Sequence, residues 1–124
     1  MEERLEFNAI NVGVLGYITL TTLTNANPAL RFVIREVGVM KGIGNWTVAA
    51  IIAVGTNATA NNLLPNGNMT TIPLRGRNET EPSIWAAASG TQIRLRVLTA
   101  GAVAVGTPLV DVYVLGRWQN ITAA

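Results

Sequence analysis

The feature that most constrains this chain is a two-residue alternation of apolar and polar side chains near its C-terminal end. In residues 92–97, aliphatic side chains at every second position alternate with Arg94 and Arg96. In residues 109–115, valines at every second position alternate with residues that include Asp111. Because successive side chains of a strand point to opposite faces, both segments are predicted to be half-buried strands. No segment keeps an apolar period of 3.6 residues over three turns, so the chain is expected to be all-β.

Further strand candidates are separated by clusters of Asn, Gly and Pro, which favour turns. The expected strands are 17–23, 30–40, 46–54 and 69–74, and the expected turns are 25–28, 41–45, 57–62 and 65–68. Pro73 is typical of an edge strand, and the charged segment 76–81 reads as a surface loop. Many short strands in one domain predict a single-domain antiparallel β-sandwich of jelly-roll or Greek-key type.

With 124 residues the chain is long enough for one domain. We expect the sandwich to cover residues 13–118 and a C-terminal tail to cover residues 119–124. Residues 1–12 hold three of the seven acidic residues, followed by a loose alternation of Leu5 and Phe7 with polar residues. This segment is either the first strand or an arm that reaches a neighbouring subunit, and the residues favour neither alternative.

The two best strand candidates are joined by residues 99–107, a linker that suits either a hairpin or a longer loop. If the two strands pair in antiparallel fashion, Asp111 faces Arg94 or Arg96. An exposed ion pair of this kind contributes roughly 0.2–1 kcal/mol, mostly to strand register. The same three residues are candidates for an ion pair between subunits.

The composition argues against catalysis. The chain has no histidine and no cysteine, which excludes disulfides, thiolate nucleophiles and histidine acid–base chemistry. Glu79 and Glu81 form a tight carboxylate pair outside the N-terminal segment, but neighbours on one loop rarely flank a cleft. No phosphate-binding glycine motif or calcium loop is present. We therefore expect a protein that is not an enzyme, with no catalytic, cofactor or metal site.

Charge and hydropathy narrow the choice of partners. The net charge of +2 is too small for a nucleic-acid footprint. The apolar runs are far shorter than the ~20 residues of a spanning helix, and the first residues lack the pattern of a signal peptide. We expect an unexported protein without a membrane or nucleic-acid partner.

The tryptophans are candidates for packing or for recognition. Trp46 opens the most apolar segment and is expected in the core. Trp85 and Trp118 either close an end of the sandwich or face a partner. An exposed aromatic beside Asn and Thr side chains would suit a glycan, as in a lectin-like site.

The low charge is the most informative anomaly of composition. Only 13% of the residues are charged, about half of the ~25% typical of soluble domains. A small protein usually covers its surface with charged side chains. One way to accommodate an uncharged surface is to bury it in an oligomer or a larger assembly, so we expect this chain to associate.

The C-terminal stretch ASGTQIRLRV at residues 88–97, followed by DVYVLG at residues 111–116, resembles the closing hairpin of small jelly-roll proteins of tailed bacteriophages. The resemblance spans about residues 86–118, a quarter of the chain. It implies a virion structural protein made in the host cytoplasm. Members of this group are capsid cement (decoration) proteins or the heads of tail fibres and receptor-binding proteins, and both are typically homotrimers.

In the first case the implied role is to bind the outer capsid lattice, with the major capsid protein as partner, and to stabilise it. In the second, the implied role is a tail-associated receptor-binding or lectin-like carbohydrate-binding module. The chain has no coiled-coil or repeat segment for a fibre shaft, which favours the cement protein.

Our candidates for the interface come from the residues themselves. Leu5 and Phe7 would belong to the arm, with Trp85 or Trp118 as a buried aromatic anchor of the kind that dominates interfaces. If the arm alternative holds, removing residues 1–12 leaves a folded domain that no longer associates.

Overall fold

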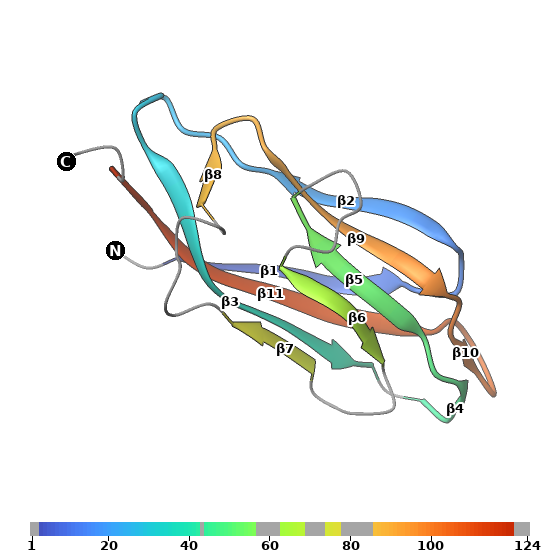
Figure 1. Cartoon of the computed structure of the whole chain (residues 1–124). Coiled ribbons are helices and arrows are strands. Elements are labelled where there is room, and N and C mark those ends of the chain that lie inside the picture. Colours follow the sequence, from blue (N-terminus) through green and yellow to red (C-terminus); the bar gives the residue numbers. More distant parts are fainter. Residues whose placement is uncertain (1–2, 43, 57–62, 69–73, 78–85, 121–124) are drawn as a thin grey trace.

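The computed structural model describes residues 3–42, 44–56, 63–68, 74–77 and 86–120. These residues form two antiparallel sheets that pack face to face, and a short ribbon at one end (Figure 1). Nowhere in these ranges is there a helix of the length and apolarity needed to cross a membrane.

The first sheet has the order β1-β11-β3-β7, with β8 also paired to β3. Its strands are β1 (Glu3–Asn11), β11 (Leu109–Gln119), β3 (Arg31–Lys41), β7 (Leu74–Arg77) and β8 (Ala86–Ala88). The second sheet has the order β2-β9-β5-β6. Its strands are β2 (Gly16–Thr22), β9 (Gln92–Thr99), β5 (Ile51–Gly55) and β6 (Leu64–Asn68). The ribbon pairs β4 (Trp46–Val48) with β10 (Ala102–Val103).

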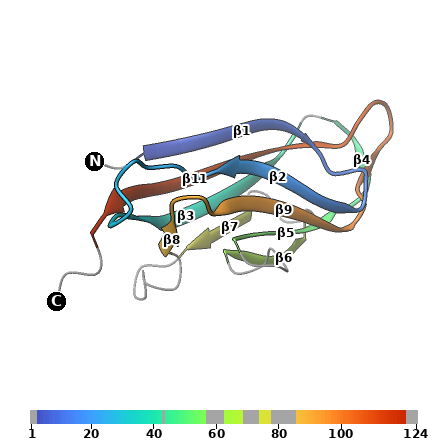
Figure 2. The ribbon, with the colours of Figure 1, turned by 90° about the horizontal axis from the view of Figure 1, so that it is seen from above.

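The strand order is that of a jelly roll. Four antiparallel pairs are nested along the chain, with β1 against β11, β2 against β9, β3 against β7, and β5 against β6. The pairs β11·β3 and β9·β5 then join them into two sheets. The edge strands β1 and β2 lie along one side of the sandwich, and β6 and β7 lie along the other (Figure 2). The predicted all-β antiparallel sandwich is confirmed.

The core lies between the two sheets and is aliphatic. Each inner strand contributes every second side chain, as the alternation of the sequence predicts. Burying one such side chain is worth about 1.5–3 kcal/mol. Among the described residues, no charged or polar residue is buried. The largest fully buried side chains are Val12, Phe32, Ile34, Val37, Val39, Ile52, Val54, Leu63, Ile93, Leu95 and Val110.

Of the two alternatives for residues 99–107, the longer loop holds, and residues 92–97 and 109–115 do not form a hairpin. The two segments belong to β9 and β11, which lie in different sheets. Both strands carry buried aliphatic side chains on their inner face, and these faces meet across the core instead of side by side. The linker between them contains β10 and crosses from one sheet to the other (Figure 1).

The ion pair expected from that hairpin is absent for the same reason. Asp111 lies opposite Met40 of β3, and Arg94 and Arg96 lie opposite Thr19 and Tyr17 of β2. Asp111 therefore lies on the first sheet, whereas both arginines lie on the second.

Two other segments differ from the sequence-based prediction. Residues 65–68, expected to be a turn, belong to β6, where Pro65 is tolerated because β6 is an edge strand.

The apolar segment 46–54 divides into β4 and β5, and in β5 residues 52–55 are buried, as expected of a strand covered on both faces. The expected strand at 69–74 lies outside the described residues except for Leu74, which begins β7.

Residues 3–11 form β1 at the edge of the first sheet, paired with β11. The register shifts between Phe7 and Ile10, where Ala9 adopts a φ of 57°. This bulge leaves Leu5, Phe7 and Ile10 packed against the core as half-buried side chains. At the other terminus β11 runs to Gln119, beyond the start expected for the tail.

The position of β1 changes the expected effect of deleting residues 1–12. Deletion would expose one edge of β11 and remove the fully buried Val12 together with the three half-buried apolar side chains of β1, so we expect a lower thermal stability. The point variant Phe7→Ala should cost about 1–3 kcal/mol, less than a fully buried Phe because the ring is half-buried. Asn8→Ala, at an exposed neighbour, should change the free energy of unfolding by no more than about 0.5 kcal/mol. Chemical denaturation measures both, and equal stability of the two variants would contradict this role of β1.

Candidate interaction surface

One end of the sandwich presents exposed aliphatic side chains from three segments that lie far apart in the sequence. The β1–β2 turn, β4 and the loop between β10 and β11 lie together there (Figures 1 and 2). Val14, Leu15, Val48 and Val105 are 66%, 63%, 46% and 90% exposed. We call these four residues the apolar end. A cluster of exposed aliphatic side chains on a small protein commonly marks an interaction site.

Backbone hydrogen bonds hold the three segments together. The amide of Val12 donates to the carbonyl of Pro108 at 3.0 Å, and the amide of Gly101 donates to the carbonyl of Val12 at 2.9 Å. The amide of Ala104 donates to the carbonyl of Asn45 at 2.8 Å. A surface that is already ordered loses less conformational entropy when a partner binds.

Trp46 supports this end from beneath. A Cβ atom on Gly101 would lie 2.7 Å from Cζ3 of Trp46, so only glycine lets the chain pass over the indole. The indole Nε1 donates to the carbonyl of Gly42 at 3.3 Å, and Nζ of Lys41 lies 5.7 Å from the ring centroid. Trp46 packs against the core, as the sequence suggests, but it is half-buried.

The segments of the apolar end carry no charge. Residues 12–16, 44–50 and 98–109 contain no Asp, Glu, Lys or Arg. Removing a charged side chain from water is costly, whereas aliphatic side chains gain by leaving it. This end of the molecule can therefore be desolvated at a lower cost than a charged surface.

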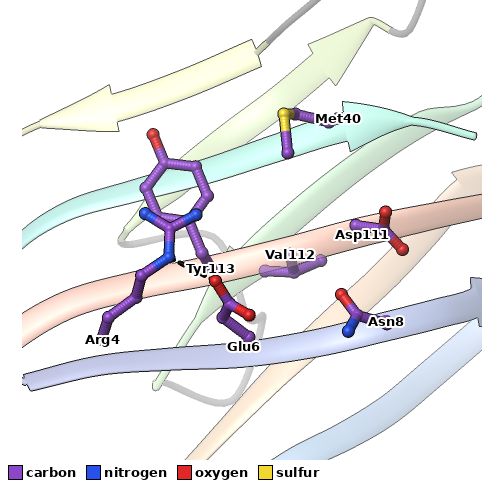
Figure 3. Close-up of a pocket in the computed structure, with 7 residues that line it drawn as sticks. All are labelled: Arg4, Glu6, Asn8, Met40, Asp111, Val112 and Tyr113. Carbon is purple, nitrogen blue, oxygen red and sulfur yellow. Dashed lines mark hydrogen bonds and ion pairs between the residues drawn. The ribbon is translucent and has the colours of Figure 1, made fainter.

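The outer face of the first sheet carries a packed tyrosine. The ring of Tyr113 covers Gly38, where an added Cβ would lie 2.1 Å from Cε1 of the ring. The hydroxyl of Tyr113 donates to Oε2 of Glu36 at 2.7 Å. The guanidinium of Arg4 lies 4.2 Å from the ring centroid on the solvent side and pairs with Glu6 (Figure 3). Tyr113 is consequently only 5% exposed.

A shallow pocket lies beside Tyr113, lined in part by Glu6, Asn8, Met40 and Asp111 (Figure 3). Its two carboxylates have structural partners, since Glu6 pairs with Arg4 and Oδ1 of Asp111 accepts the amide of Ala9 at 2.9 Å. Within the described ranges, no group of three or more Asp or Glu residues is placed to hold a metal ion. We assign these carboxylates to the stability of the β1 bulge and the tyrosine packing.

The outer face of the second sheet carries a basic and aromatic cluster. Tyr17 is 48% exposed. The guanidinium carbons of Arg94 and Arg96 lie 4.9 and 5.3 Å from its ring centroid. We call these three residues the arginine–tyrosine cluster. The strand pairing places Arg96 directly opposite Tyr17, and Arg94 opposite Thr19 on the same face.

Three of the four interface candidates from the sequence pack against the core. Leu5 and Phe7 point toward the core from β1. Trp118 also packs against the core, with its ring 5.3 Å from that of Phe32 in an edge-to-face arrangement. Trp85 lies outside the described residues, as do Glu79 and Glu81.

Sequence reasoning missed the residues of the apolar end. Each of these four residues lies in a short loop or a three-residue strand, which is too short for a periodic pattern to indicate whether its side chains are exposed. The signal that was available is the absence of charge in the three segments, which becomes meaningful once they are known to meet.

Comparison with known proteins gives structural neighbours only. No family model and no curated protein matches this chain. A chain from the acid-stable capsid structure of the Helicobacter pylori bacteriophage KHP30 superposes with a TM-score of 0.59. The match covers 97% of this chain and 94% of that chain, at 14% identity. A chain from the capsid asymmetric unit of the cyanophage Pam1 superposes with a TM-score of 0.55, covering 93% of this chain and 80% of that chain at 14% identity.

These likenesses establish a shared fold. At 14% sequence identity, the similarity extends to the path of the backbone and not to the identity of the side chains. The jelly roll derived above from strand pairing is thus an architecture also present in the capsids of these two phages.

The packing of Tyr113 on Gly38 can be tested by a double-mutant cycle. Gly38→Ala should destabilise the fold by about 1–3 kcal/mol, because the added methyl group overlaps the ring. Tyr113→Ala removes the ring, so the double variant should lose clearly less than the sum of the two single variants. Urea denaturation measures the three differences. Additive effects would show that the ring does not press on residue 38.

Proposed function

We propose that this chain is a bacteriophage virion structural protein, and specifically a capsid cement protein without enzymatic activity. The observation that carries the proposal is the fold likeness to a KHP30 capsid chain over 97% of this chain and 94% of that one. Because the match leaves little of either chain uncovered, the two are of nearly equal length. A sandwich of this size thus fits a place in a phage capsid.

The apolar end supports the cement role. A protein that binds neighbouring subunits of a shell needs a rigid contact surface whose desolvation costs little free energy. Val14, Leu15, Val48 and Val105 provide such a surface, and the backbone hydrogen bonds beneath them keep it in place. We propose that this end contacts the major capsid protein on the outer capsid lattice, and that the protein binds there as a homotrimer, where modest contacts add up by avidity.

The alternative of a lectin-like or receptor-binding module has less support. It depends on an exposed aromatic platform for a sugar ring. Trp46 and Trp118 both pack against the core, and Arg94 and Arg96 lie beside the exposed ring of Tyr17.

Copy number per particle tests the proposal. Quantitative mass spectrometry of purified virions from the source should find hundreds of copies per particle, as expected of a protein repeated over a capsid lattice. A few copies to a few tens would overturn the cement role and favour a tail component. No copies at all would overturn the virion role.

The oligomeric state is a second test. Analytical ultracentrifugation at micromolar concentration should give about three times the chain mass of 13.2 kDa. A clean monomer would count against the proposed homotrimer.

Variants of the apolar end test the contact surface. The triple variant V14S/L15S/V105S should fold normally, because exposed substitutions usually change stability by no more than about 0.5 kcal/mol. It should bind purified capsid shells at least about tenfold more weakly, a loss of ~1.4 kcal/mol. The matched control A26S/A29S alters exposed residues between β2 and β3, at the opposite end of the sandwich, and should bind like the wild type. Equal binding of both variants to the shells would rule out the apolar end as the contact.

A further inference from the structure

We propose that the outer edge of β2 binds an extended segment of a partner protein as an additional strand of the second sheet. The backbone of that segment would pair with Gly16–Thr22, and its side chains would cover the side of the core that β2 leaves half open. This inference rests on the proposed function only for the identity of the partner, which would be the capsid protein that the apolar end contacts.

The backbone of β2 is paired on one side. β2 is the terminal strand of the order β2-β9-β5-β6 and pairs with β9. In an antiparallel strand, every second residue directs both its N–H and its C=O group away from a given neighbour. Across the part of the chain that the structure describes, no backbone hydrogen bond reaches this outer edge of β2. A row of such donors and acceptors matches the edge of another extended peptide.

β2 lacks the features that protect the other edge strands. β1 has three charged residues among residues 3–6 and the bulge at Ala9. β6 contains Pro65, and β7 has two arginines in four residues. Charges, bulges and prolines prevent the addition of a further strand. β2 has seven residues without charge or proline, and a single register shift after Thr19. It is therefore the described edge that is most open to another strand.

The core is incompletely covered beside β2. Ile18 lies opposite Leu95 of β9, so both side chains point to the same face. Leu95 is 0% exposed, whereas Ile18 is only half-buried because no strand covers its other side. Leu20 is half-buried as well, and so are the three apolar side chains of β1, the edge strand of the first sheet on the same side of the sandwich (Figure 2). A strand added to β2 would remove this apolar surface from water, which is favourable.

The two faces of β2 specify the chemistry of the segment. Side chains of a strand alternate between faces, so one set of the added side chains would lie over Ile18 and the half-open core. These side chains are expected to be apolar. The other set would lie beside Tyr17 and Thr19, which are exposed, and polar side chains fit there. The ligand is thus an extended segment with an apolar residue at every second position.

The direction of β2 favours a capsid segment over a second copy of this chain. Val14 and Leu15 of the apolar end directly precede β2. If the β2 edges of two copies paired in antiparallel fashion, their apolar ends would lie at opposite ends of the pair. The two copies could not then contact one shell through that surface. A segment of the capsid protein, in contrast, can bind β2 while the same protein contacts the apolar end.

Hydrogen exchange of the full chain, read by mass spectrometry with and without purified capsid shells, is the direct test. The amides of residues 17–22 that point away from β9 should exchange quickly in the free protein. On shells they should exchange at least about tenfold more slowly, because a backbone hydrogen bond protects an amide. Slower exchange at the apolar end alone would overturn the inference and leave the proposed function intact.

A matched pair of variants tests the half-open core beside β2. I18K and I18Q both remove a half-buried apolar side chain and should lower the melting temperature to a similar extent. Lysine can keep its charge in water at an open edge, but an added strand would bury that charge. I18K should therefore bind shells about tenfold more weakly than I18Q. Equal binding of the two variants to shells would contradict the addition of a strand over Ile18.

A peptide probe tests the edge without shells. The probe is an octapeptide of alternating threonine and valine with a lysine at each end, and the control has proline in place of its central valine. In an NMR titration, the probe should shift the backbone amide signals of residues 17–22 saturably and slow their exchange, and the control should not. If the wild type does not bind shells but the probe has this effect, the proposed function fails and the inference stands. If neither shells nor the probe slow the exchange at β2, the inference fails.

The concentration of the chain tests self-pairing. Hydrogen exchange at residues 17–22 should not depend on the concentration of the protein alone. Exchange that becomes slower as this concentration rises, with neither shells nor probe present, would overturn the inference in favour of a contact between two β2 edges.

Discussion

The structure depends on the long ladder between β3 and β11. This pairing runs from Arg31 opposite Gln119 to Lys41 opposite Val110, with one irregularity. It holds the first sheet together, because β1 attaches to one side of β11 while β7 and β8 attach to β3. The ladder also brings Gly38 under the ring of Tyr113 and so creates the packing that Arg4 covers.

The jelly-roll topology explains how a chain with few charged residues acquires a defined contact surface. Nested pairing brings the β1–β2 turn, the ribbon strands and the loop before β11 to one end of the sandwich. Each of these segments is free of charge, and together they present the apolar end. The arginine–tyrosine cluster borders it on the second sheet. In the function proposed here, the apolar end is the surface from which a partner excludes water.

Local sequence patterns predicted where the strands lie in the chain better than they predicted which strands pair. Alternation correctly marked β9 and β11, because a half-buried strand needs an apolar side chain at every second position. The same pattern could not reveal that the two inner faces meet across the core, since pairing side by side and packing face to face bury the same residues. The ion pair of Asp111 with Arg94 or Arg96, which was conditional on that pairing, therefore does not form, and Oδ1 of Asp111 accepts the amide of Ala9 instead. Pro65 predicted a turn because a single sequence does not show that β6 lies at an edge.

The amino-acid sequence by itself determined the all-β class, the positions of the main strands, the aliphatic core and the shortage of charge. These are properties of neighbouring residues, and elementary steric and hydrophobic preferences are enough to predict them. Only the tertiary structure decided which strands pair, that residues 3–11 close the edge of the first sheet, and that Val14, Val48 and Val105 share one end. These depend on contacts between residues distant in the sequence, which the packing of two sheets brings together and no local period records.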